Sequence, residues 1–157
     1  MNIRPALETD LPVIIDLIRE LAHFEKEPDA VEVTLEELRR DGFGDAPQFS
    51  IIVAEVENEI LGMAFYYFRY STWKGKTIHL EDLIVREKSR GTGAGTALYA
   101  AVIKRGAEEG VRRIEWAVLD WNEPAIAFYE KSGALILRDW HLVQMDQQGI
   151  KNFIDRL

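Results

Sequence analysis

Apolar residues recur at helical spacing in the first part of the chain. The stripe follows Asp10, a suitable N-cap, and Pro12, which fits a first helical turn. Its members are Val13, Ile14, Leu17, Ile18 and Leu21. Because this interval places them on one face of a helix, the pattern predicts an amphipathic helix here.

Capping signals indicate three further helices. Thr34 is followed three residues later by Glu37, which is the spacing of a capping box. Gly42 is a suitable stop for that helix. In the same way, Gly110 can end a helix that begins near Gly93, and Ser132-Gly133 can end one that begins at Glu123. We therefore expect helices at residues 35–41, 93–109 and 123–131.

Short apolar runs bounded by turn residues predict strands. The turn Glu57-Asn58-Glu59 separates two such runs, so these two strands should form an antiparallel hairpin. The expected strands cover residues 3–6, 50–56, 60–70, 77–85, 113–119, 135–137 and 141–145. The order, a hairpin followed by strand–helix–strand–helix–strand, predicts an α/β (α+β) fold. We expect a mixed, mostly antiparallel sheet of six to seven strands flanked by about four helices, with one crossover connection.

Length and charge narrow the class of protein. The chain has 157 residues and neither an internal repeat nor a linker, so a single domain over 1–157 is expected. Its formal net charge is −8, whereas a protein that follows nucleic-acid phosphates carries a basic face. We therefore expect no nucleic-acid partner, and an acidic protein suits a cationic ligand.

Cysteine is absent, which excludes a disulfide framework, thiolate metal sites and a cysteinyl acyl-enzyme. The three histidines are too scattered for a metal-binding pattern, so no metal is expected. The N-terminus does not read as a signal peptide, and no apolar stretch approaches the ~20 residues that span a bilayer. The sequence thus predicts a cytoplasmic protein with no membrane partner.

A glycine-rich loop stands between a predicted strand and a predicted helix: Arg90-Gly91-Thr92-Gly93-Ala94-Gly95. Backbone N–H groups at a helix N-terminus are unpaired and carry partial positive charge. Glycines let a phosphate approach these groups closely, and Arg90 adds a formal charge. The loop is a candidate site for a phosphorylated ligand, although a loop that merely needs unusual backbone angles is the alternative.

Other phosphate-binding loops fit less well. A nucleotide P-loop needs Lys and then Ser or Thr after the last glycine, but Thr96-Ala97 follow here. A dinucleotide fingerprint needs glycine at Thr96. A methyltransferase that binds S-adenosylmethionine remains an alternative, with Asp120 as the acidic residue after the next strand. Against it, Ser89-Arg90 stand where such loops carry an acidic residue.

The loop matches the R/Q-x-x-G-x-G/A signature of the GNAT N-acetyltransferase superfamily, and further segments sharpen the match. These segments are Asp41-Gly42-Phe43-Gly44, Tyr66-Tyr67-Phe68, Ser71-Thr72-Trp73-Lys74-Gly75-Lys76, Leu80-Glu81-Asp82, Asp120-Trp121-Asn122-Glu123-Pro124 and Phe128-Tyr129. Together they resemble the spermidine/spermine N-acetyltransferase (diamine acetyltransferase) family over nearly the whole chain. The residues at 70–82 and 117–122 are closer to its thialysine acetyltransferase branch. The chain departs from the polyamine branch at Phe24, where that branch has tyrosine.

The resemblance implies the acceptor site. An amine must be neutral to attack, and a lysine-like amine with a pKa near ~10.4 is neutral in only about one molecule in a thousand at pH 7. The family resemblance makes Glu81 the general base, working through water, and Asp82 a ligand of the distal amine. Glu81 and Asp82 are adjacent in a predicted strand, so their side chains point to opposite faces of the sheet unless the strand is bulged. The resemblance further assigns Glu25 as an anionic substrate contact, and Trp73 and Trp140 as aromatic walls.

The resemblance also implies how acetyl-CoA, the expected co-substrate, is held. The loop Arg90-Gly91-Thr92-Gly93-Ala94-Gly95 takes its pyrophosphate. The backbone of Leu83, Ile84 and Val85 pairs with its pantetheine arm, and their N–H groups could polarise the thioester carbonyl. Accessory contacts come from Asn122 and Lys131, although Lys131 could equally be a solvated cation at a helix end.

Tyr129 resembles the general acid that protonates the leaving thiolate. The alternative for Tyr129 is a half-buried aromatic with a wet hydroxyl. Because no cysteine is present and no serine–base pair shows, direct attack in a ternary complex is the simplest scheme.

The expected activity is N-acetylation of a small cationic primary amine, either a diamine, a polyamine or a lysine-like amino acid. A methyltransferase and a non-catalytic acyl-CoA-binding module are the alternatives. The family resemblance further implies a homodimer, in which Trp140 reaches the neighbouring subunit's site.

Overall fold

The computed structural model describes residues 1–157, which divide into two compact units at residues 1–117 and 118–157. The first unit holds all strands of the chain. Its elements are β1 (Asn2–Pro5), η1 (Glu8–Asp10), α1 (Leu11–Phe24), α2 (Leu35–Phe43), β2 (Ser50–Val56), β3 (Glu59–Ser71), β4 (Gly75–Val85), η2 (Glu87–Ser89), α3 (Ala94–Glu108) and β5 (Ile114–Glu115). The second unit holds α4 (Glu123–Lys131) and α5 (Gln147–Ile154).

The sheet has the order β1-β2-β3-β4-β5. The first four strands are antiparallel to their neighbours, and β4 and β5 are parallel. The helix α3 connects this parallel pair, as the sequence predicted for a crossover. Glu57 and Asn58 both have positive φ, which is the backbone of a tight hairpin turn between β2 and β3.

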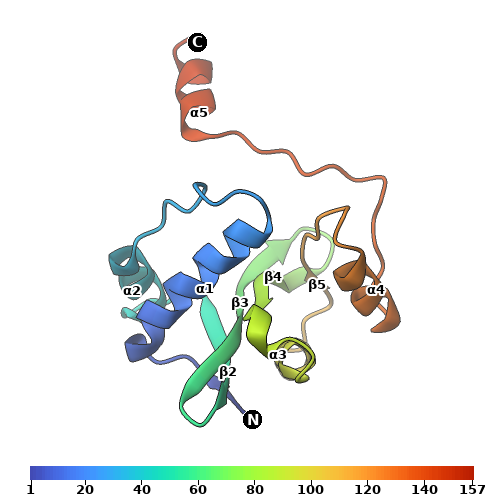
Figure 1. Ribbon diagram of the computed structural model, residues 1–157. Helices are drawn as coiled ribbons and strands as arrows, with labels where there is room; N and C mark the ends of the chain where they lie inside the picture. The colour runs from blue at the N-terminus through green and yellow to red at the C-terminus, as the bar shows by residue number, and fades with distance from the viewer. The chain divides into compact units, whose positions relative to one another are not determined.

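The face of the sheet that carries Met63 and Ile84 is covered by α1, whose Leu11, Ile14 and Leu17 are fully buried against it. The helix begins as predicted, with Pro12 in its first turn. The other face is covered by α3, which packs on β3 and β4 with Leu98 and Val102 fully buried. The first unit is therefore a three-layer arrangement with α1 and α2 on one side of the sheet and α3 on the other (Figure 1).

Most predicted elements are confirmed within two residues, including the Thr34–Glu37 capping box. Gly42 does not end α2, which runs on to Phe43. A Cβ at Gly42 would lie 2.3 Å from Cε2 of Phe49, so this glycine makes room for an aromatic ring. Gly110 does end α3, with φ of 63°.

The C-terminal strands were predicted wrongly. Only Ile114–Glu115 of the run 113–119 pairs with β4, and no strand forms at 135–137 or 141–145. The mixed α/β architecture is confirmed, but the sheet has five strands rather than six to seven. The helix α5 was not predicted; its cap is Asp146, whose Oδ1 accepts a hydrogen bond from Gly149 N at 2.7 Å.

Candidate active site

A β-bulge in β4 brings two carboxylates onto one face of the sheet. Phe65 of β3 lies opposite Asp82, but the next residue, Tyr66, lies opposite Leu80, which leaves Glu81 without a partner. The Tyr67 hydroxyl donates to Glu81 Oε2 at 3.1 Å, so Glu81 is on the side of Tyr67. Because Phe65 and Tyr67 share a face, Glu81 and Asp82 share it too.

This face is the one that α1 covers, and the last turn of α1 leads to a third carboxylate, Glu25. Asp82 is half-buried. Its burial, and then the negative charges of Glu81 and Glu25, raise the pKa of Asp82 to about 7. Desolvation also raises the pKa of Glu25. Burial and two neighbouring negative charges raise the proton affinity of Asp82, so this cluster of three carboxylates favours a cation.

Two aromatic side chains surround Glu81. His79 Nε2 is 3.5 Å from Glu81 Oε2, and the His79 ring lies on the Tyr67 ring with a centroid distance of 5.2 Å. Burial, followed by the Glu81 charge, raises the pKa of the Tyr67 phenol, so it stays protonated and remains a donor. Sequence reasoning assigned no role to Tyr67 or His79, because their contact with Glu81 depends on the bulge.

One edge of β4 is open beyond His79. The pairing of β4 with β5 ends at His79 opposite Glu115, while β4 stays paired with β3 as far as Val85. The backbone of Leu83, Ile84 and Val85 therefore keeps one edge without a partner strand. Such an edge accepts an extended ligand by strand-like pairing.

The glycine loop lies directly after β4 and η2. Gly91 and Gly93 have φ of 77° and 87°, and Gly93 occupies the N-cap of α3 without any side-chain cap. A Cβ at either glycine would meet nothing within 4 Å. The N-terminus of α3 therefore offers uncapped N–H groups beside open space, which suits an anion.

The other residues of the glycine loop make contacts with nearby parts of the first unit. Thr92 Oγ1 donates to the Ser89 carbonyl at 2.7 Å, so this hydroxyl closes the turn. Arg90 is exposed, and its guanidinium lies over the Phe24 ring at 5.2 Å. Gly95 lies in the first turn of α3, where an added Cβ would be 3.6 Å from Val85 Cγ2, an ordinary van der Waals contact, so Ala94 and Gly95 begin the helix beside the end of β4.

Trp73 lies apart from Glu81 and Asp82, the two carboxylates of β4. It sits in the turn between β3 and β4 and is 78% exposed. Its backbone N–H donates to Ser71 Oγ at 3.2 Å. The structure thus brings Glu25, Glu81 and Asp82 together and leaves Trp73 at the tip of the hairpin.

The second unit carries the remaining predicted residues. Asn122 caps α4 by accepting a hydrogen bond from Ala125 N at 3.4 Å, and Lys131 is exposed at the other end of the helix. Tyr129 is buried, and its ring lies 5.4 Å from that of Phe128. Trp140 is 68% exposed beyond α4.

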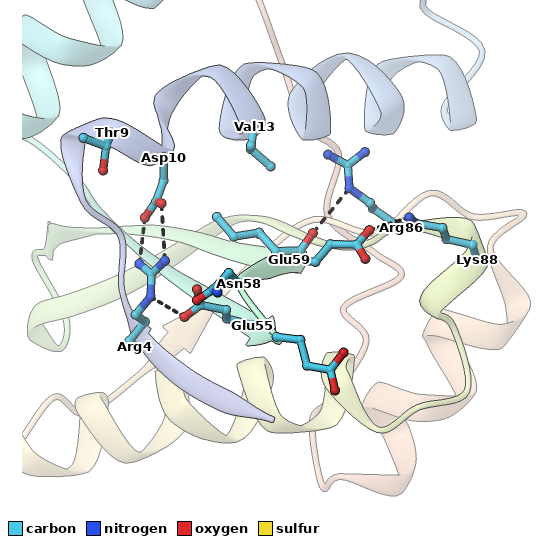
Figure 2. Close-up of a pocket in the computed structure, with 11 residues that line it drawn as sticks. Arg4, Thr9, Asp10, Val13, Glu55, Asn58, Glu59, Arg86 and Lys88 are labelled. Atoms are coloured by element: carbon cyan, nitrogen blue, oxygen red, sulfur yellow. Dashed lines mark hydrogen bonds and ion pairs between the residues drawn. The ribbon is translucent and has the colours of Figure 1, made fainter.

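A separate cavity of about 380 Å³ opens near the β2–β3 turn (Figure 2). Most of its charged side chains are paired: Arg4 bridges Asp10 and Glu55, and Lys88 pairs with Glu59. None of the predicted site residues lines it. This cavity is therefore not where the carboxylates and the glycine loop meet.

No group of three or more His, Cys, Asp or Glu side chains is arranged to hold a metal ion. None of the helices is both long and apolar enough to cross a membrane.

Comparison with known proteins places these features in a family. Residues 14–134 match the acetyltransferase (GNAT) family. A bovine thialysine N-epsilon-acetyltransferase is 38% identical over 95% of this chain and 94% of its own length. The human spermidine/spermine N(1)-acetyltransferase-like protein 1 is 36% identical over 94% of this chain, but over only 23% of that longer protein.

Among solved structures, an integron cassette protein of V. cholerae superposes with a TM-score of 0.79 over 98% of this chain and 96% of its own, at 20% identity. The chain therefore belongs to the acetyltransferase (GNAT) family, and it is an N-acetyltransferase. Members of this family use acetyl-CoA as co-substrate. The expected fold class and family are confirmed, and neither a methyltransferase nor a non-catalytic module is retained.

Proposed function

We propose that this chain transfers the acetyl group of acetyl-CoA to a primary amine of a small cationic substrate by direct attack in a ternary complex. The observation that carries the proposal is the bulge at Glu81. It sets a cluster of carboxylates beside the open edge of β4, and β4 leads into the uncapped helix N-terminus at Gly93.

The proposed acceptor class is a diamine, a polyamine or a lysine-like amino acid. Relatives are named for thialysine and for spermidine/spermine, and all of these compounds carry a cationic primary amine. Asp82 and Glu25 bind the positive charge of the substrate away from the reacting nitrogen. Trp140 is proposed to add an aromatic face, worth about 0.5–2 kcal/mol to a cation, whereas Trp73, at the tip of the β3–β4 hairpin, is given no contact with the amine.

Glu81 is the proposed proton acceptor, directly or through a water. Its carboxylate takes a proton from the substrate ammonium, and the electron pair of the broken N–H bond stays on nitrogen. The neutral amine then attacks the thioester carbonyl carbon, and the C–S bond breaks as the amide forms. The second proton lost by nitrogen balances the proton that the leaving thiolate gains.

The donor side uses the end of β4 and the loop. Backbone groups of Leu83, Ile84 and Val85 pair with the pantetheine arm, and one of their N–H groups polarises the thioester carbonyl. The pyrophosphate binds at Arg90-Gly91-Thr92-Gly93-Ala94-Gly95, because uncapped helix N–H groups and a guanidinium attract anions.

The second unit supplies the remaining groups. The Tyr129 hydroxyl donates a hydrogen bond to the departing thiolate. A thiol has a pKa near ~8.5 and a phenol near ~10, so hydrogen bonding helps more than full proton transfer. Asn122 and Lys131 contact the coenzyme. We regard residues 1–157 as one functional domain, since the family match runs from residue 14 to residue 134 and so continues into the second unit.

Amine-dependent release of free CoA tests the proposed function. Purified protein is incubated with acetyl-CoA and a panel of thialysine, lysine, ornithine, putrescine and spermidine. We expect thiol release with at least one of these amines and none with the corresponding alcohols. Binding of acetyl-CoA without turnover of any amine would contradict the proposal.

The charge of Asp82 should control substrate affinity. Its pKa of about 7 lies above its usual range, so the carboxylate is charged above pH 7 and loses its charge below it. Between pH 8 and pH 6 the KM for the cationic amine should rise by about tenfold, whereas Asp82→Asn should have a high KM at both pH values. A wild-type KM that stays ten times lower than that of Asp82→Asn at pH 6 would contradict this role.

A homodimer is proposed because the C-terminal segment leaves many apolar side chains exposed. No residue of α5 is buried, and this many exposed apolar side chains in one segment favour an interaction site. The exposed residues are Leu135, Leu137, Trp140, Leu142, Val143, Met145, Ile150, Phe153, Ile154 and Leu157. Sedimentation should show a dimer that Phe153→Asp shifts to monomer, and a monomeric wild type would contradict the proposal.

A further inference from the structure

Two neighbouring side chains contact the same oxygen of Glu81. The Tyr67 hydroxyl donates to Oε2 at 3.1 Å, and His79 Nε2 lies 3.5 Å from Oε2. The two rings also lie against each other. Both contacts are to Oε2, which leaves Oε1 for a water or for the amine.

The tautomer of His79 follows from its other neighbour. Arg69 Nη1 lies 3.5 Å from His79 Nδ1, and a guanidinium can only donate hydrogen bonds. In the neutral ring Nδ1 is then the acceptor, and the proton is on Nε2, the nitrogen that lies 3.5 Å from Glu81 Oε2. Tyr67 therefore donates a hydrogen bond to Glu81 Oε2, and the Nε2–H group of His79 lies beside the same oxygen as an electrostatic partner.

Residues of β3, β4 and β5 fix the position of the His79 ring. Arg69 of β3 pairs with Glu115 of β5 at 2.5 Å, and Glu115 is held in turn by Arg113 at 2.7 Å. His79 of β4 lies between them in the sheet, opposite Tyr67 on one side and Glu115 on the other. His79 is also half-buried, with 20% of its side chain exposed, so it has little freedom to turn away.

The bulge makes such support necessary. Glu81 is the one residue of β4 between Leu80 and Asp82 without a partner on β3, and half of its side chain is exposed. An exposed carboxylate on an unpaired residue samples several rotamers, and a proton acceptor must be held within hydrogen-bond reach of the group that it deprotonates. The hydrogen bond from Tyr67 and the contact with His79, both at Oε2, hold the carboxylate in one orientation.

We propose that Tyr67 and His79 are positioning residues for acetyl transfer, which together orient the Glu81 carboxylate so that Oε1 faces the amine. They gain and lose no proton in the reaction; the proton of the ammonium goes to Glu81 alone. This inference rests on the proposed role of Glu81 as proton acceptor.

The test compares kcat, the amine KM and CoA affinity in Tyr67→Phe, His79→Phe and His79→Gln. The two Phe variants should each lower kcat by about tenfold, as expected for loss of a hydrogen bond to a charged group, with CoA affinity changed less than about twofold. The Gln variant keeps a nitrogen donor near the Nε2 position and should recover most of kcat. Tyr70→Phe is the matched control, because Tyr70 is 80% exposed on the same strand, and it should leave kcat unchanged.

The same substitutions are then made in a Glu81→Gln background, where they should have no further effect on kcat. Phe variants that melt at the wild-type temperature and keep kcat within twofold would overturn the inference, as would an undiminished effect in the Glu81→Gln background. If Glu81→Gln alone leaves kcat unchanged, the proposed proton acceptor itself is wrong. If Glu81→Gln lowers kcat and the Phe variants do not, only the positioning role fails.

Discussion

A Glu81→Gln variant is expected to lower kcat for amine acetylation by about 100-fold near neutral pH, because positioned acid–base groups contribute at least this much. The amide keeps the size of the side chain but accepts no proton, so only the small neutral fraction of the amine reacts. CoA affinity should stay within about twofold, since the proposed donor contacts lie at the end of β4 and in the glycine loop. Initial rates of thiol release, with CoA binding by calorimetry, separate the two quantities.

The control for this variant is Glu57→Gln. Glu57 is an exposed glutamate in the β2–β3 turn, where it lines the separate cavity of Figure 2. Its substitution removes the same charge from the protein and should leave kcat unchanged. If the Glu81 variant retains more than half of wild-type kcat, the proton acceptor is another group.

The second large effect is expected at Gly93. Its φ of 87° is unfavourable for any other residue, and an added Cβ would point into open space at the helix N-terminus rather than into the protein. Gly93→Ala should weaken CoA binding by about 10- to 100-fold, because the methyl group keeps the pyrophosphate from the N–H groups of α3 and charge-assisted hydrogen bonds are lost. Calorimetric titration with CoA measures the loss.

Backbone strain alone must be separated from this effect, and α3 offers a matched control at its other end. Gly110 has φ of 63°, and a Cβ there also meets nothing within 4 Å. Gly110→Ala should therefore cost about the same 1–2 kcal/mol of strain as Gly93→Ala, and so a similar drop in Tm. It should leave CoA affinity unchanged. Equal losses of CoA affinity in the two variants would mean that strain, not the phosphate site, explains the result.

Much of the fold was predictable because its signals are local. The capping box of Thr34 and Glu37 and the turn at Glu57-Asn58 act within a few residues, and the structure keeps both. The missed helix α5 also has local signals, namely the Asp146 cap and the apolar residues Ile150, Phe153 and Ile154 at helical spacing, so the sequence could have predicted it. The false strands at 135–137 and 141–145 have strand-like composition, but a strand needs a partner, and the sheet offers none to them.

In the site, too, residues with local signals could be predicted, whereas features that depend on strand pairing could not. Glu81, Asp82 and the glycine loop could be selected from the sequence, since their residue types and motif are visible in it. The register shift between Phe65 and Tyr66 could not, because it depends on how β3 pairs with β4. That shift turns two adjacent carboxylates to one face and brings Tyr67 and His79 to Glu81. The raised pKa of Asp82 follows from burial and from Glu25, which lies 57 positions earlier in the chain.

The central claim is that the N-terminus of α3 with Arg90 holds the pyrophosphate of the acetyl donor. Calorimetric titration of the wild-type protein with CoA and with pantetheine, which has the same thiol arm but no nucleotide and no pyrophosphate, tests it most directly. CoA should bind about 100-fold more tightly than pantetheine, and Arg90→Ala should remove a large part of that difference. Equal affinity for the two compounds, or a difference that Arg90→Ala and Gly93→Ala leave intact, would contradict the account.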